Sequence, residues 1–196
     1  IRVYTTDLIT HQRIIQLMRT TLMIPIEIAI CALTYLVLFY LNQFITEPLE
    51  QARGINWIFL PAGVRIFLTL IFALEGAIGL ALASLAKNFF GFYEYDLTTI
   101  IGIAIICALA PLLGRYFVIH NLNVLPDLSN LSYQQILFSI ITYSLFSSGL
   151  HQAWFATRGL ESGSWNHFYV MFLAHFSELN DFLDIHIFTD KVQGIL

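Results

Sequence analysis

The chain has 196 residues, of which 58% are hydrophobic and only 11% are charged, and its formal net charge is −4. Soluble globular domains carry roughly 25% charged residues, so this composition excludes an ordinary water-facing surface. Together with a mean hydropathy of +0.74, it indicates an integral membrane protein whose main partner is the lipid bilayer. The weak, dispersed negative charge predicts no nucleic-acid partner.

Six apolar stretches are long enough to form transmembrane helices, because a bilayer core about 30 Å thick needs roughly 20 residues. We expect spans near Leu22–Phe44, Trp57–Leu74, Ala77–Phe92, Leu97–Val118, Gln134–Ala156 and His167–Phe188. The apolar runs are continuous, whereas the strands of a membrane barrel alternate apolar and polar residues. The sequence therefore predicts an all-α, polytopic helical bundle of about six spans (five to six), forming one integral membrane domain over residues 1–196.

Basic and aromatic residues predict how this bundle lies in the membrane. The N-terminal segment carries Arg2, Arg13 and Arg19 against a single acid, Asp7, and Lys/Arg-bearing segments favour the cytoplasmic side. Six spans return the C-terminus to the same side, so we expect both termini in the cytoplasm. Tryptophan and tyrosine favour the headgroup level. Aromatic groups fall at the predicted outer ends of the spans, at Trp57, Phe89–Tyr95, Trp154–Phe155 and Trp165–Tyr169.

Residues 1–20 mix apolar and polar side chains and precede the first predicted span. This pattern fits an amphipathic helix on the inner membrane surface. It fits equally well an N-terminal extension of the first span, and the sequence leaves both interpretations open.

The second and third predicted spans contain the most patterned stretch of the chain. Pro61 removes a backbone donor and Gly63 lacks a side chain, so a helix begins or kinks there. Gly79 and Ala83, like Ala77 and Ala81, have the small-xxx-small spacing that lets helix backbones approach closely. Helix packing is the main interpretation of Pro61, Gly63, Gly76, Gly79 and Ala83. The alternative is a broken helix whose freed backbone groups line a cavity.

This stretch resembles the MASE-type membrane-associated sensor domains of bacteria. The resemblance rests on W-x-x-x-P-A-G at 57–63, followed by Glu75-Gly76 and glycine-spaced residues through Ser84, and on a polar, acid-bearing last span. It implies a multi-span sensory input of the kind fused to diguanylate cyclases or histidine kinases, in the bacterial cytoplasmic (inner) membrane. Asp181 is the residue in the last span that the resemblance carries over.

Ionisable residues inside apolar segments are candidates for a buried polar site or an ion path. Glu27 and Arg65 fall within predicted spans, and Glu75 lies at the short turn between the second and third. A charge at membrane depth costs about 2.5–3.5 kcal/mol on insertion scales and normally finds a protein partner. We therefore expect Arg65 to pair with Glu27 or Glu75. Contact with a ligand or lipid headgroup is the alternative.

The last predicted span is the most polar. Its ionisable and polar residues are His175, Ser177, Glu178, Asn180, Asp181, Asp184 and His186. So many polar groups cannot face lipid. The segment therefore leaves the bilayer early, or it faces the bundle interior, a partner protein or a watery cavity. In a watery cavity, Glu178 and Asp181 would form a proton or cation path.

His151 and His167 fall near the outer ends of the fifth and sixth spans, where two facing helices could supply a bis-imidazole haem or metal site. Lone histidines at such positions more often form simple hydrogen bonds, and no CxxCH, HExxH or cysteine cluster supports a metal. Cys31 and Cys107 lie in apolar runs and are expected to be small buried residues. We expect no cofactor, no metal and no catalytic residue, because no nucleophile elbow or phosphate loop is present.

These features favour a non-catalytic membrane protein, acting as a sensor-like protein or as an accessory or scaffold subunit held to other membrane subunits. A small transporter or ion-conducting bundle that uses the buried carboxylates is the rival hypothesis. A lipid-modifying membrane enzyme is the third. Its candidate residues are His151, Arg158, Glu161 and His167 at the outer edge.

Overall fold

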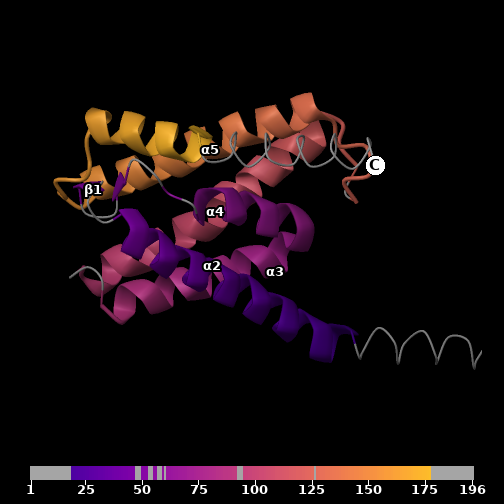
Figure 1. Cartoon of the computed structure of the whole chain (residues 1–196), viewed down its shortest axis with the longest axis horizontal. Coiled ribbons are helices and arrows are strands. Elements are labelled where there is room, and N and C mark those ends of the chain that lie inside the picture. The colour runs from indigo at the N-terminus through magenta and orange to yellow at the C-terminus, as the bar shows by residue number, and fades with distance from the viewer. Residues whose placement is uncertain are drawn as a thin grey trace, which may run out of the picture.

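The structure is a computed structural model that describes residues 19–46, 50–52, 55–56, 59, 61–91, 95–125 and 127–177. Its long elements are helices, in chain order η1 (Arg19–Met23), α2 (Ile24–Thr46), α3 (Pro61–Phe89), α4 (Leu97–Asn121) and α5 (Tyr133–Thr157) (Figure 1). Residues 165–177 are helical as well. A small antiparallel hairpin joins β1 (Glu50–Ala52) to β2 (Ile55–Asn56). The predicted helical fold is confirmed, with this hairpin as an addition.

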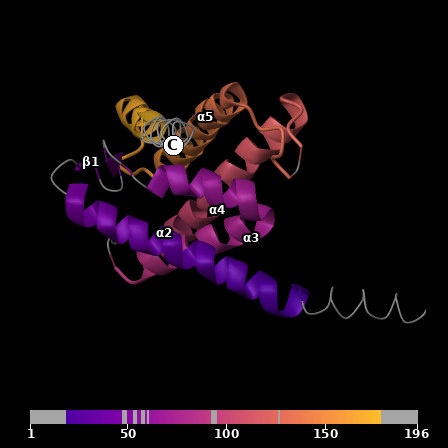
Figure 2. The ribbon, with the colours of Figure 1, turned by 45° about the vertical axis from the view of Figure 1, so that its right-hand side comes forward.

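Three helical stretches are long and apolar enough to cross a membrane: Thr21–Thr46, Pro61–Phe89 and Leu97–Asn121. The chain is accordingly a multi-pass membrane protein. Large apolar side chains such as Leu33, Val37 and Phe44 on α2 are exposed, as expected where the solvent of the outer surface is lipid. In both views α2 lies alongside α3 (Figures 1 and 2), and α4 packs against both α3 and α5.

Helix α3 is bent back on itself at Ala73, where the backbone has φ 48° and ψ −114°. Leu68 from the first arm packs with Leu80 and Ala83 from the second arm in one buried cluster, so the arms run antiparallel. The arms correspond to the second and third predicted spans. At 1.5 Å per residue they are about 18 and 24 Å long, and together they return the chain to the end of the bundle at which α3 began.

The bend at Ala73 offers a test of backbone strain. An alanine at this positive φ is strained by about 1–3 kcal/mol, whereas glycine adopts such a conformation freely. We expect Ala73→Gly to raise the free energy of unfolding by that amount, measured by titration with sodium dodecyl sulfate. Ala81→Gly, within the regular second arm, should instead lower it by about 0.5–1 kcal/mol. Equal losses in the two variants would show that Ala73 is unstrained.

Helix α4 begins at a polar cap that also holds the end of α5. The Asp96 carboxylate accepts hydrogen bonds from the backbone N–H and hydroxyl of Thr99, and Arg158 Nη2 donates to it over 2.9 Å. The hydrogen bonds from Thr99, with the Arg158 guanidinium, lower the pKa of Asp96 to about 2 from an ordinary value of 3.8. The ionised carboxylate therefore stabilises the folded state.

The sign of the resulting pH dependence follows from the lowered pKa. The stabilisation by Asp96 is complete above about pH 4 and is lost as the pH falls through about 2. We expect the thermal unfolding temperature of the wild type to fall across this window. Asp96→Asn keeps a capping side chain. Its unfolding temperature should be lower than that of the wild type at pH 7 and should fall less on acidification. An unchanged acid-induced fall in Asp96→Asn would rule out this role.

Candidate functional site

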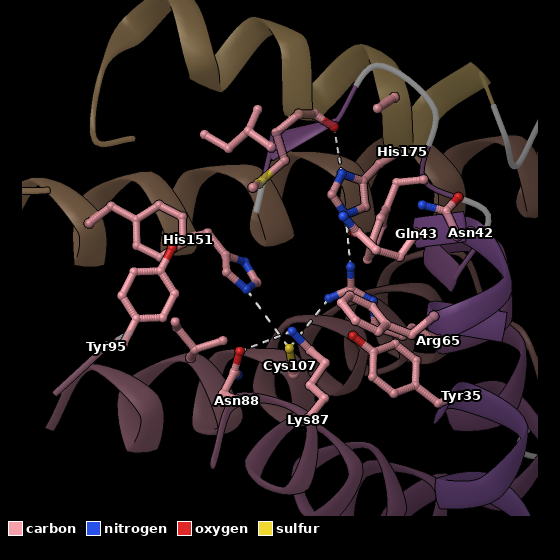
Figure 3. Close-up of a pocket in the computed structure, with 17 residues that line it drawn as sticks. Tyr35, Asn42, Gln43, Arg65, Lys87, Asn88, Tyr95, Cys107, His151 and His175 are labelled. Carbon is pink, nitrogen blue, oxygen red and sulfur yellow. Dashed lines mark hydrogen bonds between the residues drawn. The ribbon is translucent and has the colours of Figure 1, made fainter. Parts of the chain in front are cut away.

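A cavity lies within the helical bundle, between α2, both arms of α3, α4, α5 and the helical residues 165–177 (Figure 3). It holds about 710 Å³ of space free of protein atoms, part of it open to solvent. Its polar lining residues are Tyr35, Asn42, Gln43, Arg65, Lys87, Asn88, Tyr95, Cys107, His151 and His175. They come from the C-terminal parts of α2 and α5, both ends of α3, the N-terminal half of α4 with the preceding Tyr95, and the helical residues 165–177, which supply His175. The cavity therefore lies toward one end of the bundle.

Arg65 is the central polar residue of the cavity and is only 3% exposed. Its Nη1 donates to Cys107 Sγ at 3.5 Å and its Nη2 lies 3.2 Å from His175 Nε2. The guanidinium lies 5.0 and 5.7 Å from the ring centroids of Phe59 and Tyr35, within the range of a cation–π attraction. Its Nε is buried and has no hydrogen-bond partner among the described residues.

The hydrogen bonds of the two histidines fix which nitrogen carries the proton. His175 Nδ1 bonds the Met171 carbonyl, and His151 Nδ1 lies 2.7 Å from the Ser147 carbonyl. A carbonyl oxygen only accepts, so each Nδ1 carries a proton. Arg65 only donates, so His175 Nε2 must accept from it and the His175 ring is neutral. His151 Nε2 lies 3.9 Å from Cys107 Sγ.

Lys87, near the end of α3, brings a second cation to the same cavity. It is 8% exposed, and its Nζ donates to Asn88 Oδ1 at 3.2 Å and lies 4.4 Å from the ring centroid of Phe39. The hairpin of α3 brings Lys87 and Arg65, which are 22 positions apart in the chain, into one lining (Figure 3).

No carboxylate lies among the residues that the structure describes as lining the cavity. Glu27 and Glu75 are half-buried. Glu27 lies one turn before Cys31, which is next to Gly79 of the second arm of α3, and Glu75 lies two residues after the bend at Ala73. Within the described part of the chain, neither forms an ion pair with Arg65. The expected pairing of Arg65 with Glu27 or Glu75 is therefore wrong for these residues, because the two acids lie near the bend and Arg65 near the start of the first arm.

The other wall of the cavity is apolar. Ile55 of β2, Ile103 of α4, Phe155 of α5 and Met171 form one buried hydrophobic cluster. These four residues also line the cavity, and Ala174, one residue before His175, lies beside them. Cys107, which contacts Arg65, belongs to the same cluster, so the lining combines a cationic part with an apolar part.

The small residues singled out in the sequence lie mainly in helix contacts. Pro61 is the first residue of α3, and Gly63 is buried within its first turn. A Cβ on Gly76 would lie 2.5 Å from the Leu68 carbonyl oxygen of the opposite arm, and a Cβ on Gly79 would lie 2.7 Å from the Ile28 carbonyl oxygen of α2. Ala83 is buried between α2 and α3. The close approach of the helix backbones explains why positions 76 and 79 are occupied by glycine.

Two groups of predicted site residues remain: His151 and His167, which have different contacts in the structure, and residues that lie outside its described part. His151 contacts Cys107, whereas His167 Nδ1 lies 2.9 Å from Ser164 Oγ and 3.1 Å from the Ser162 carbonyl. Across the described residues, no group of three or more histidine, cysteine or acidic side chains could hold a metal ion. Glu178, Asp181 and Trp57 lie outside the described residues, as does the segment 1–18.

The sequence analysis missed Lys87 and the role of Cys107. Lys87 lies within the predicted third span, Ala77–Phe92, and Gly79, Ala83 and Lys87 are spaced by four, so they share one helix face. That spacing was the signal that could have placed Lys87 in the packed interior. Cys107 was expected only to fill space, whereas its sulfur contacts both Arg65 and His151.

Three comparisons with known proteins place no constraint on this site. No protein-family model, no curated protein and no solved structure matches the chain.

Proposed function

We propose that this chain is a non-catalytic, sensor-like membrane protein that recognises a small molecule in the cavity. The observation that carries the proposal is the origin of the lining residues: α2, both arms of α3, α4, α5 and the helical residues 165–177 all contribute. A bound molecule would contact every one of these elements, so its presence would change their relative stability. Ligands act on conformational equilibria through such differential contacts.

The predicted topology is part of this proposal. The arms of α3 return the chain to the end of the bundle at which α3 began. The following helices therefore begin on the same side of the membrane whether the two arms cross the bilayer fully or only partly. With cytoplasmic termini, the cavity lies toward the outer side of a bacterial cytoplasmic membrane. The exposed Phe89, Phe90 and Trp165 fit the headgroup level at that end. The resemblance to sensor domains supports the same role, and an accessory subunit of a larger assembly would use the cavity in the same way.

The experiment replaces a small apolar residue of the cavity lining by a larger one that would occupy the space of the ligand. Ala174 is 1% exposed and lines the cavity, whereas the neighbouring Leu173 is 49% exposed. Native mass spectrometry of the protein in lipid nanodiscs should show a retained small molecule in the wild type and in Leu173→Phe, and none in Ala174→Phe. An empty wild type, or retention that Ala174→Phe leaves unchanged, would overturn the proposal. Solute flux in liposomes that Ala174→Phe abolishes would favour a transporter instead.

One observation favours a catalytic alternative. Cys107 Sγ lies 3.9 Å from His151 Nε2 within the cavity, and a cysteine sulfur beside an imidazole nitrogen is the arrangement of a cysteine nucleophile and its base. Cys107→Ser distinguishes the two functions. Under the sensor-like function the variant keeps the bound molecule, whereas under the catalytic function it accumulates unconverted substrate.

A further inference from the structure

We propose that the molecule bound in this cavity is a small organic anion, with an oxyanion group held by Arg65 and Lys87 and an apolar body against the apolar part of the lining. The proposal rests on the proposed function, because it names the ligand class of the same cavity. It is carried by two buried cations that share one lining without a carboxylate among the described residues.

The charge imbalance points to a missing anion. Buried charges are normally paired, because taking a charge out of water is unfavourable by several kcal/mol. Arg65 and Lys87 are 3% and 8% exposed, and the contact with the Arg65 donor requires a neutral His175 ring, which offers no compensating charge. The ring contacts of Arg65 and Lys87 offset only part of the loss of water, since a cation–π contact is worth roughly 2 kcal/mol when desolvated. An anion between the two cations would complete the balance.

The hydrogen-bond inventory points the same way. Arg65 and Lys87 only donate, and so does the buried Nε of Arg65, which has no partner among the described residues. The lone pair of His175 Nε2 already receives a donor from Arg65, and His151 Nε2 is already in contact with Cys107. What the cationic wall lacks is therefore an acceptor with several lone pairs, which describes a carboxylate or a phosphate.

The apolar wall selects an organic ion over an inorganic one. Ile55, Ile103, Phe155 and Met171 form a buried cluster that faces the cavity. A bare inorganic ion would leave this wall against water, whereas a ring or short alkyl chain would cover it at about 25 cal/mol per Å² of apolar surface buried.

Cys107 provides a reporter inside the cavity, because the chain has only one other cysteine, Cys31. In a Cys31→Ala background, the cavity thiol is treated with methanethiosulfonates that carry either a sulfonate or a trimethylammonium group. Each rate is divided by the rate of the same reagent with a free thiol. A cationic cavity concentrates anions, so the normalised sulfonate rate should exceed the ammonium rate by about tenfold or more.

Matched variants connect this selectivity to the two cations. The preference for the sulfonate reagent should disappear in Lys87→Gln and be kept in Lys87→Arg, while Cys107→Ser shows no reaction. Phenyl phosphate should protect Cys107 at lower concentration than inorganic phosphate. Nanodiscs of anionic and of neutral lipid distinguish whether the bound anion is a lipid headgroup or a soluble molecule. A lipid headgroup in the cavity would slow the reaction of Cys107 in the anionic nanodiscs even when no soluble anion is added.

Equal or reversed reagent rates in the wild type would overturn the inference. This failure is distinct from failure of the proposed function. A retained molecule that Ala174→Phe excludes, together with no preference for the sulfonate reagent, would show a cavity that binds a neutral or cationic ligand. Inorganic phosphate protecting as well as phenyl phosphate would contradict the organic body.

Discussion

Replacing Arg65 by methionine is expected to raise the free energy of unfolding of the ligand-free protein by about 1–4 kcal/mol, the range seen when buried ion pairs are replaced by apolar residues of similar volume, because an unpaired buried charge is at least as costly as a paired one. After the substitution, the polar groups that contact Arg65 still have other polar contacts. His175 Nε2 keeps a contact with Ser147 Oγ at 3.3 Å, and Cys107 keeps its contact with His151. The methionine side chain retains packing against the rings of Tyr35 and Phe59.

The same substitution should abolish ligand binding, so stability and function would change in opposite directions. Unfolding by sodium dodecyl sulfate after exhaustive dialysis measures the first effect, and native mass spectrometry measures the second. Lys87→Met makes the same test at the other cation, and it should also raise the free energy of unfolding and abolish ligand binding. A loss of more than about 2 kcal/mol in the dialysed Arg65→Met protein would mean that Arg65 already has an anionic partner within the chain.

Functional sites are common places for a residue to be retained at a cost in stability. In this chain the pattern is specific: a buried guanidinium whose contacts are two rings, a thiol and a neutral imidazole. A purely structural arginine would be expected to lie against a carboxylate. The two cations are therefore better explained by a ligand than by the fold.

The helical segments and the hairpin of α3 could be predicted from the sequence because local features determine them. A continuous apolar run can be satisfied in lipid only by a helix or a closed barrel, and Pro61 marks the residue at which α3 begins. The turn near Glu75-Gly76 was also visible, since small residues at Gly76 and Gly79 allow the close approach that an antiparallel hairpin requires. The bend itself falls at Ala73, which carries no such local signal.

The cavity could be predicted only in part, because it depends on which helix faces meet. Opposite charge suggested Glu27 or Glu75 as the partner of Arg65, yet charge complementarity says nothing about depth along a bundle. The contacts that matter join Arg65 to Cys107 and to His175, which are 42 and 110 positions away. No sequence period links residues at such separations, so these pairs follow from the tertiary packing alone.

Replacing Gly79 by valine is expected to lower the free energy of unfolding by about 3 kcal/mol, at the upper end of the range for overpacking a close contact. A Cβ at this position would lie 2.7 Å from both the Ile28 carbonyl oxygen and Cys31 Cβ of α2. Because one of these atoms belongs to the backbone, the clash can be relieved only by moving α2 away from α3. That movement would also displace Tyr35, which lines the cavity from α2.

Gly149 in α5 is the matched control, because a Cβ there would meet no atom within 4 Å. Alanine is favoured over glycine inside a helix by about 0.5–1 kcal/mol, so Gly149→Ala should raise the free energy of unfolding while Gly79→Val lowers it. Sodium dodecyl sulfate titration of both variants measures the two signs in one experiment. Displacement of Tyr35 in Gly79→Val should further weaken the selectivity of Cys107 for the sulfonate reagent, whereas Gly149→Ala leaves it unchanged. If Gly79→Val were as stable as the wild type, α2 and α3 could not approach as closely as their small residues allow.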